Sequence, residues 1–124
     1  MLKELIREKK IDYFNTHGTG TQLNDETEAQ VIRSLFGEKE TQPLINSTKS
    51  IMGHSIGASG AIEAAVTALS VQQSVVHKNL TANVMDGLNL ALVNLPCDIH
   101  VGISASYGFG GHNAALIFGK LEKS

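Results

Sequence analysis

The sequence predicts an α/β fold, because segments of strand character alternate with segments of helical character. Residues 11–15 and 43–47 have the composition of short strands, and residues 24–36 have the pattern of a helix between them. A long helix is predicted from residue 57 to about residue 75. Two further strands, 101–107 and 113–119, are separated by the glycine-rich residues 108–111, as in a hairpin.

Local signals support each helix. We expect residues 2–10 to form a short amphipathic surface helix. Asn24 or Asp25 is suited to cap the helix that follows, and Gly37 is suited to end it. The apolar face of that helix comprises Ala29, Ile32, Leu35 and Phe36. Residues 88–104 form a mixed apolar stretch that Pro96 interrupts.

The long helix is unusually apolar. Between Ile56 and Val71 its only charged residue is Glu63, and a helix that is apolar on all sides is normally buried on all sides. A chain of 124 residues makes about one small domain, which has no layer deep enough to surround such a helix. We therefore expect another polypeptide to cover it, the alternative being a core helix with one side covered by loops.

The composition of the chain excludes several classes of partner and indicates a cellular compartment. The chain has a net charge of -2, no basic stripe and only two tyrosines and four phenylalanines, so we expect no nucleic-acid partner. Its single cysteine cannot form an intrachain disulfide and fits a reducing compartment. The N-terminal residues lack the apolar core of a signal peptide, and no later run could span a bilayer. We expect a cytoplasmic protein without a membrane partner.

Two histidines lie among small residues. His17 opens the run His-Gly-Thr-Gly-Thr, and His54 closes the run Ser-Thr-Lys-Ser-Ile-Met-Gly-His. An imidazole is the side chain best suited to exchange a proton near neutral pH, so the pair suggests one site that polarises a carbonyl. No histidine pair has the close spacing of a zinc site, and we expect no metal. His77, His100 and His112 receive no role.

Together with Gly-Phe-Gly-Gly-His-Asn at residues 108–113, these segments resemble the C-terminal half of a β-ketoacyl-acyl carrier protein synthase. The three motifs occur in the family's order, and the resemblance runs from about residue 11 to residue 119. It implies a thiolase-like fold, in which two pseudo-duplicated halves stack as five α/β layers around central helices. Residues 1–124 would then be the C-terminal domain, with a mixed β-sheet and a buried apolar helix.

The resemblance also implies an activity, the decarboxylative Claisen condensation of malonyl-acyl carrier protein with an acyl thioester in fatty acid or polyketide synthesis. His17 and His54 would donate N–H bonds to the thioester oxygen of the enolate. Lys49 would pair with Glu63 and hold the loop that bears His54. This pairing suits the sequence, because a carboxylate in so apolar a helix is costly unless it is paired.

Three further site residues follow from the resemblance. Thr19 and Thr21 would hydrogen-bond the phosphopantetheine arm, which arrives on the acyl carrier protein, so the chain itself would hold no cofactor. Phe109 would gate the acyl pocket and contribute its backbone N–H to a second oxyanion hole. Asp25 and Glu28 also match the family, but acids are favoured near a helix N-terminus in any case.

The sequence departs from the family just before the glycine loop, and its one cysteine does not match the family's nucleophile, which lies in the N-terminal half. The residues before the glycine loop are Ala-Ser-Tyr at 105–107, where the family has Asn-Ser-Phe. Cys97 lacks the small-residue turn that would activate a thiolate, and we predict an inert thiol. The nucleophilic cysteine would come from an N-terminal half or a dimer partner. A non-catalytic subunit like the chain-length factors, and an inactive remnant, remain as alternatives.

Overall fold

The computed structural model describes residues 10–18, 22–54, 56–79, 87–107 and 113–121. The helix expected over residues 2–10 lies outside this part of the chain, apart from Lys10.

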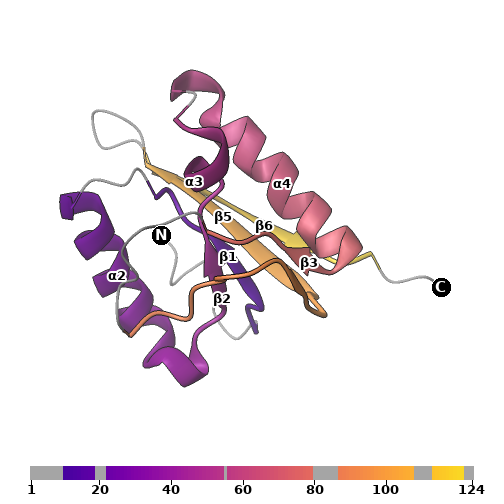
Figure 1. Cartoon of the computed structure of the whole chain (residues 1–124), viewed down its shortest axis with the longest axis horizontal. Helices are drawn as coiled ribbons and strands as arrows, with labels where there is room; N and C mark the ends of the chain where they lie inside the picture. Colours follow the sequence, from indigo (N-terminus) through magenta and orange to yellow (C-terminus); the bar gives the residue numbers. More distant parts are fainter. Residues whose placement is uncertain (1–9, 19–21, 55, 80–86, 108–112, 122–124) are drawn as a thin grey trace.

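A four-stranded mixed sheet forms the centre of the molecule (Figure 1). Its strands are β1 (Tyr13–Asn15), β2 (Leu44–Asn46), β5 (Val101–Tyr107) and β6 (Asn113–Gly119). They lie in the order β2-β1-β5-β6, with β1 parallel to both of its neighbours and β5 antiparallel to β6. The predicted α/β class and mixed sheet are confirmed, and the two strands expected on either side of the glycine loop have the predicted bounds.

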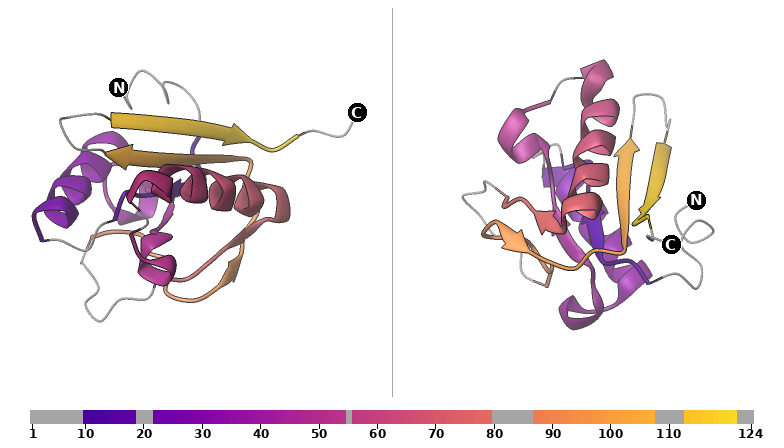
Figure 2. Two further views of the ribbon diagram at one scale, coloured as in Figure 1. Left: turned by 90° about the horizontal axis from the view of Figure 1, so that it is seen from above. Right: turned by 90° about the vertical axis from the view of Figure 1, so that its right-hand side faces the viewer.

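The two long helices cover opposite faces of this sheet (Figures 1 and 2). Successive residues of a strand point to opposite faces, and β1 shows the consequence. Phe14 belongs to the core cluster that contains Ala29 and Ile32 of α2 (Gln22–Phe36). Its neighbour Tyr13 belongs to a second cluster, with Val71 of α4 (Ser59–Gln73). The domain is therefore a three-layer sandwich, with its core on both sides of β1.

The first long helix begins earlier than predicted. It starts at Gln22, so both Asn24 and Asp25 lie inside it and neither is the cap. Asp25 is in the first turn, where the helix dipole favours an acid at any of several positions, so composition alone could not fix the first residue. Its end is as predicted, because Gly37 has a φ of 81° and donates its N–H to the carbonyl of Arg33.

The second long helix is shorter than predicted at both ends. It follows a one-turn 3-10 helix (Ile56–Ala58) and ends at Gln73, where Ser74 adopts a left-handed conformation with a φ of 55°. The chain then forms β3 (Val75–Val76), which pairs with β4 (Leu95–Pro96) in a separate two-stranded sheet. A short helix, α3 (Lys49–Met52), and a 3-10 turn (Lys39–Thr41) complete the described elements.

The two sides of α4 have an unusual distribution of polarity. The side that faces the sheet is mostly polar, and its buried residues are Ser59, Glu63, Thr67, Ser70 and Val71. The opposite side exposes Ala61, Ala65 and Leu69, and Leu69 is 51% exposed. Within the described part of the chain, the helix is thus buried on one side only. Its open side is apolar as far as Leu69 and ends in the exposed Gln72 and Gln73. None of the described helices is long and apolar enough to cross a membrane.

Candidate functional site

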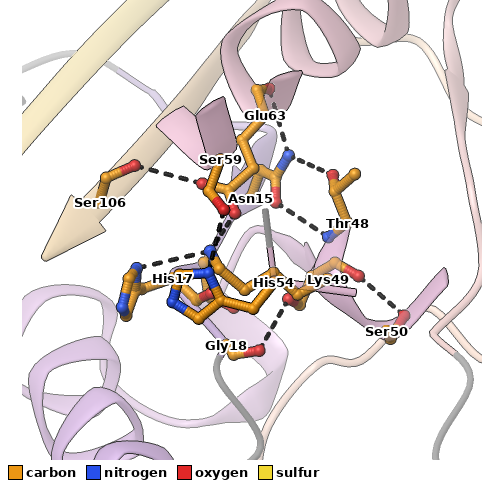
Figure 3. Close-up of polar contacts among 12 residues, drawn as sticks. Asn15, His17, Gly18, Thr48, Lys49, Ser50, His54, Ser59, Glu63 and Ser106 are labelled. Carbon is orange, nitrogen blue, oxygen red and sulfur yellow. Dashed lines mark hydrogen bonds and ion pairs between the residues drawn. The ribbon is translucent and has the colours of Figure 1, made fainter. Parts of the chain in front are cut away.

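The predicted site residues gather at one edge of the sheet. His17 follows the end of β1 by two residues, and Lys49 follows the end of β2 by three. Because β1 and β2 are parallel, their carboxyl ends meet at the same edge, the usual place for a ligand site in an α/β sheet. The N-terminal end of α4 supplies Ser59 and Glu63 beside them (Figure 3).

Lys49 and Glu63 form a buried ion pair at the centre of the site. Their side chains are 4% and 2% exposed, respectively. The Lys49 ammonium also donates to the backbone carbonyl of His17 at 2.7 Å, and the Ser106 hydroxyl donates to the second carboxylate oxygen of Glu63 at 3.2 Å. Both charges are therefore desolvated but satisfied, the condition under which a buried ion pair is tolerated. Lys49 is the first residue of the short helix α3.

His17 is held in its neutral form. Burial, followed by the positive charge of Lys49 and the proximity of His54, lowers the pKa of His17 to about 4. Its Nδ1 atom lies 3.5 Å from the Lys49 ammonium, which can only donate. A lone pair on Nδ1 is therefore favoured, and the ring proton of neutral His17 belongs on Nε2.

His54 lies beside His17, and its side chain is exposed. The two ring centroids are 6.0 Å apart and the rings are nearly perpendicular, at 87° (Figure 3). The Nδ1 atom of His54 lies 3.1 Å from the hydroxyl oxygen of Ser59. The structure thus brings His17, Lys49, His54 and Glu63 into one site, although they come from three separate segments of the chain.

Glu28 positions the turn that carries His17. Its carboxylate oxygens accept the backbone N–H groups of His17, at 2.8 Å, and Gly18, at 2.9 Å. Gly18 has a φ of 53°, and a Cβ atom there would lie 2.2 Å from the Ser47 hydroxyl oxygen, so only glycine fits. Sequence reasoning gave Glu28 little weight as an acid near a helix N-terminus. With the helix expected to begin after Asn24 or Asp25, Glu28 fell within its first turn; only the observed start at Gln22 places it beyond that turn, where the dipole effect fades.

Asn15 joins the elements that meet at the site. Its amide nitrogen donates to the hydroxyl of Thr48 at 2.8 Å and to that of Thr67 at 3.2 Å. Its amide oxygen accepts the backbone N–H of Thr48 at 3.4 Å. The network connects β1, the residue before Lys49 and the helix that carries Glu63, and sequence reasoning missed it. A polar residue at the end of a buried strand was the only sign of it.

Other predicted residues lie elsewhere. Thr19, Thr21 and Phe109 fall outside the described residues, so their roles stay predictions. Ala105, where the family has asparagine, is fully buried in the apolar core beside Ile103.

Cys97 lies far from the two histidines. Its backbone N–H donates to the carbonyl of Ser74, beyond the far end of α4. Since α4 has 15 residues and spans roughly 22 Å, this thiol is remote from the histidines at the other end. Within the described residues, no group of three or more potential metal ligands is found.

Comparison with known proteins identifies the family. The profile described as "Beta-ketoacyl synthase, C-terminal domain" matches residues 3–83. The chain belongs to this family. A curated relative, the 3-oxoacyl-[acyl-carrier-protein] synthase 2 of Staphylococcus aureus (strain COL), is 41% identical over 121 residues, which cover 94% of this chain and 29% of the relative.

Solved structures agree with the family assignment. A β-ketoacyl synthase from Burkholderia phymatum STM815 superposes with a TM-score of 0.83 and 32% identity, over 91% of this chain and 28% of that protein. A ketosynthase in complex with its chain length factor, from Xenorhabdus doucetiae, gives a TM-score of 0.78 and 33% identity, over 94% of this chain and 31% of that one. The predicted thiolase-like fold is confirmed. The chain spans about three tenths of the length of these relatives.

Proposed function

We propose that this chain is the histidine-bearing, C-terminal part of a β-ketoacyl-acyl carrier protein synthase. The complete enzyme would condense malonyl-acyl carrier protein with an acyl thioester in fatty acid or polyketide synthesis. One observation supports this most strongly: two imidazoles, one of them neutral at physiological pH, lie side by side above a buried lysine–glutamate pair.

The site suits the decarboxylation of a malonyl thioester. Cleavage of the bond to the carboxylate releases carbon dioxide and leaves the electron pair on the α-carbon, delocalised onto the thioester oxygen. His17 and His54 would stabilise that oxygen with two N–H bonds, a contribution of about 3 to 4 kcal/mol per donor. Burial, together with the positive charge of Lys49, would keep His17 neutral, and Lys49 would hold the backbone of His17 in place through the carbonyl contact.

The second half of the reaction needs groups beyond the described site. The α-carbon of the enolate would attack the acyl group held as a thioester on a cysteine, and the thiolate would leave. The backbone N–H of Phe109 would contribute to the oxyanion hole of this step. Thr19 and Thr21 would bind the phosphopantetheine arm of the acyl carrier protein, and the chain itself would need no cofactor. The enzyme would act in the cytoplasm.

The cysteine would come from an N-terminal half or a dimer partner. The apolar outer side of α4, with Ala61, Ala65 and Leu69, offers a surface for that half. The exposed side chains of Ile51 and Met52 on α3 extend the apolar character beyond that helix. Two alternatives are a non-catalytic subunit like the chain-length factors and an inactive remnant. Neither alternative explains why His17, Lys49 and Glu63 are retained together in one site.

Reconstitution tests the proposal. Purified chain would be incubated with acyl- and malonyl-carrier protein, alone and with a cysteine-bearing half, and β-ketoacyl product would be measured by mass spectrometry. We expect product only with both halves, and we expect the Cys97→Ala variant to be as active as wild type in that mixture. Product formed by the chain alone, and surviving Cys97→Ala, would contradict the proposal.

A further inference from the structure

The hydroxyl of Ser59 contacts a residue outside its own helix. Ser59 is the first residue of α4, one position after the N-cap, so its hydroxyl is not committed to capping the helix. The N-cap of this helix is Ala58, which makes no side-chain cap bond, and the Ser59 hydroxyl contacts Nδ1 of His54 instead, at 3.1 Å (Figure 3). Ser59 is 6% exposed, so water competes little for this hydrogen bond.

This contact bears on which nitrogen of His54 carries the proton. A neutral imidazole has one N–H donor and one acceptor, and its neighbours decide which is which. If the Ser59 hydroxyl donates to Nδ1, then Nε2 carries the hydrogen and can donate to a ligand. The opposite arrangement would direct the lone pair of Nε2 at a negatively charged oxygen and would repel it. Lys49 imposes the same choice on His17, so both rings would present an Nε2–H group.

Ser59 also connects His54 to the helix that carries Glu63. His54 is an exposed residue between α3 and the 3-10 helix, and it follows Gly53, which has a φ of 74° and around which a Cβ would have open space. Ser59, by contrast, belongs to a long helix that packs against β5, and the neighbouring turn of that helix carries the buried Glu63. The hydrogen bond therefore connects the exposed ring of His54 to α4, which packs against β5.

We propose that Ser59 is a positioning residue for His54: its hydroxyl donates to Nδ1 and fixes the orientation and tautomer in which His54 stabilises the enolate oxygen. This inference rests on the proposed function. Ser59 itself touches no reacting atom, and it acts through His54 alone.

The test compares variants of the complete synthase, which contains this chain and the cysteine-bearing half. Carbon dioxide release from radiolabelled malonyl-carrier protein and acylation of the cysteine would be followed separately. For Ser59→Ala we expect a kcat of decarboxylation about 3- to 10-fold lower, the effect of one neutral hydrogen bond. We expect KM for malonyl-carrier protein and the rate of acylation to stay near wild type. Ser59→Thr keeps the hydroxyl and should recover most of the loss.

Ser70→Ala is the matched control. Ser70 lies on the same helix and is similarly buried, at 7% exposed, but its hydroxyl contacts Tyr13, away from the histidines. Both alanine variants remove one buried hydroxyl from α4, so their thermal midpoints should fall by similar amounts. Only Ser59→Ala should slow decarboxylation.

A double-mutant cycle separates positioning from a general structural effect. In a His54→Ala background, Ser59→Ala should cause no further loss. The role of Ser59 would be overturned if the Ser59→Ala variant decarboxylated at the wild-type rate. It would also be overturned if Ser59→Ala slowed decarboxylation as much in the His54→Ala background as in the wild type. Either result would leave the proposed function intact. If His54→Ala itself decarboxylated at the wild-type rate, the proposed function would fail, and the inference with it.

Discussion

Removal of Lys49 should destabilise the fold strongly, and Lys49→Met is the sharpest form of the change. Methionine preserves most of the volume of the lysine chain, so the substitution removes the charge with little loss of packing. Glu63 would keep only the hydroxyl of Ser106 as a side-chain hydrogen-bond donor to its carboxylate, among the described contacts. The carboxylate would then be a buried charge without a counterion, since its side chain is 2% exposed.

The size of the effect follows from the burial of both partners. Breaking a buried ion pair by removing one member typically costs about 3–5 kcal/mol, a large part of the roughly 5–15 kcal/mol that stabilises a small domain. The double variant Lys49→Met with Glu63→Gln removes the orphaned charge as well. It should regain at least about 2 kcal/mol relative to Lys49→Met alone, because the two sites are directly coupled.

Equilibrium unfolding in urea, followed by far-UV circular dichroism in dilute solution, measures these differences. Lys10→Met provides the control, since the Lys10 side chain is 91% exposed and its ion pair with Asp12 has a distance of 3.9 Å. That variant should unfold at the wild-type midpoint. A loss of less than about 1 kcal/mol in Lys49→Met, or a double variant no more stable than the single one, would show that Lys49 does not neutralise a buried charge on Glu63.

Three further predictions concern the site, the core and the open face of the helix. The pKa of His17 in the folded state is about 4, below its usual 6.5, because the ring is buried beside Lys49. The folded state therefore binds fewer protons than the unfolded state, and the free energy of unfolding should fall as the pH is lowered from about 6.5 toward 4. An NMR titration of the His17 ring proton near 6.5 would contradict this. Gly102→Ala would place a Cβ atom 2.9 Å from a methyl carbon of Val71 and should lower the free energy of unfolding in urea by about 1–3 kcal/mol. The control is Gly57→Ala, whose Cβ would meet no atom within 4 Å and should leave the midpoint unchanged. Equal midpoints for the two variants would argue against the close packing of α4 on β5. The isolated chain should associate and bind apolar dyes through the side of α4 that exposes Leu69, and sedimentation as a monomer without dye binding would count against a missing half.

Much of the fold could be predicted because its signals are local. Strands β5 and β6 are continuous runs with a glycine-rich segment between them, so both ends of each were predicted. Helix α3 has four residues and β3 has two, and elements so short have no measurable periodicity. The end of α4 was predicted about two residues late, because Ser74 takes a left-handed conformation that its residue type does not announce.

Some residues of the site could be predicted from the sequence and others could not. The pairing of Lys49 with Glu63 was expected from the family resemblance, and the cost of a lone carboxylate in an apolar helix agreed with it. Glu28 and Asn15 could not be placed, since Glu28 bonds backbone N–H groups and Asn15 bonds residues 33 and 52 positions away. Such contacts depend on how strands and helices pack, and neither composition nor spacing along the chain records them.

If His54 stabilises the enolate oxygen, His54→Ala should impair decarboxylation and spare acylation of the cysteine. In the complete synthase, release of radiolabelled carbon dioxide from malonyl-carrier protein would be measured beside the mass of the acylated cysteine. Loss of one oxyanion donor should slow decarboxylation by on the order of a hundredfold or more, while acylation of the cysteine continues at the wild-type rate. A variant that decarboxylated normally and failed to acylate the cysteine would contradict the account.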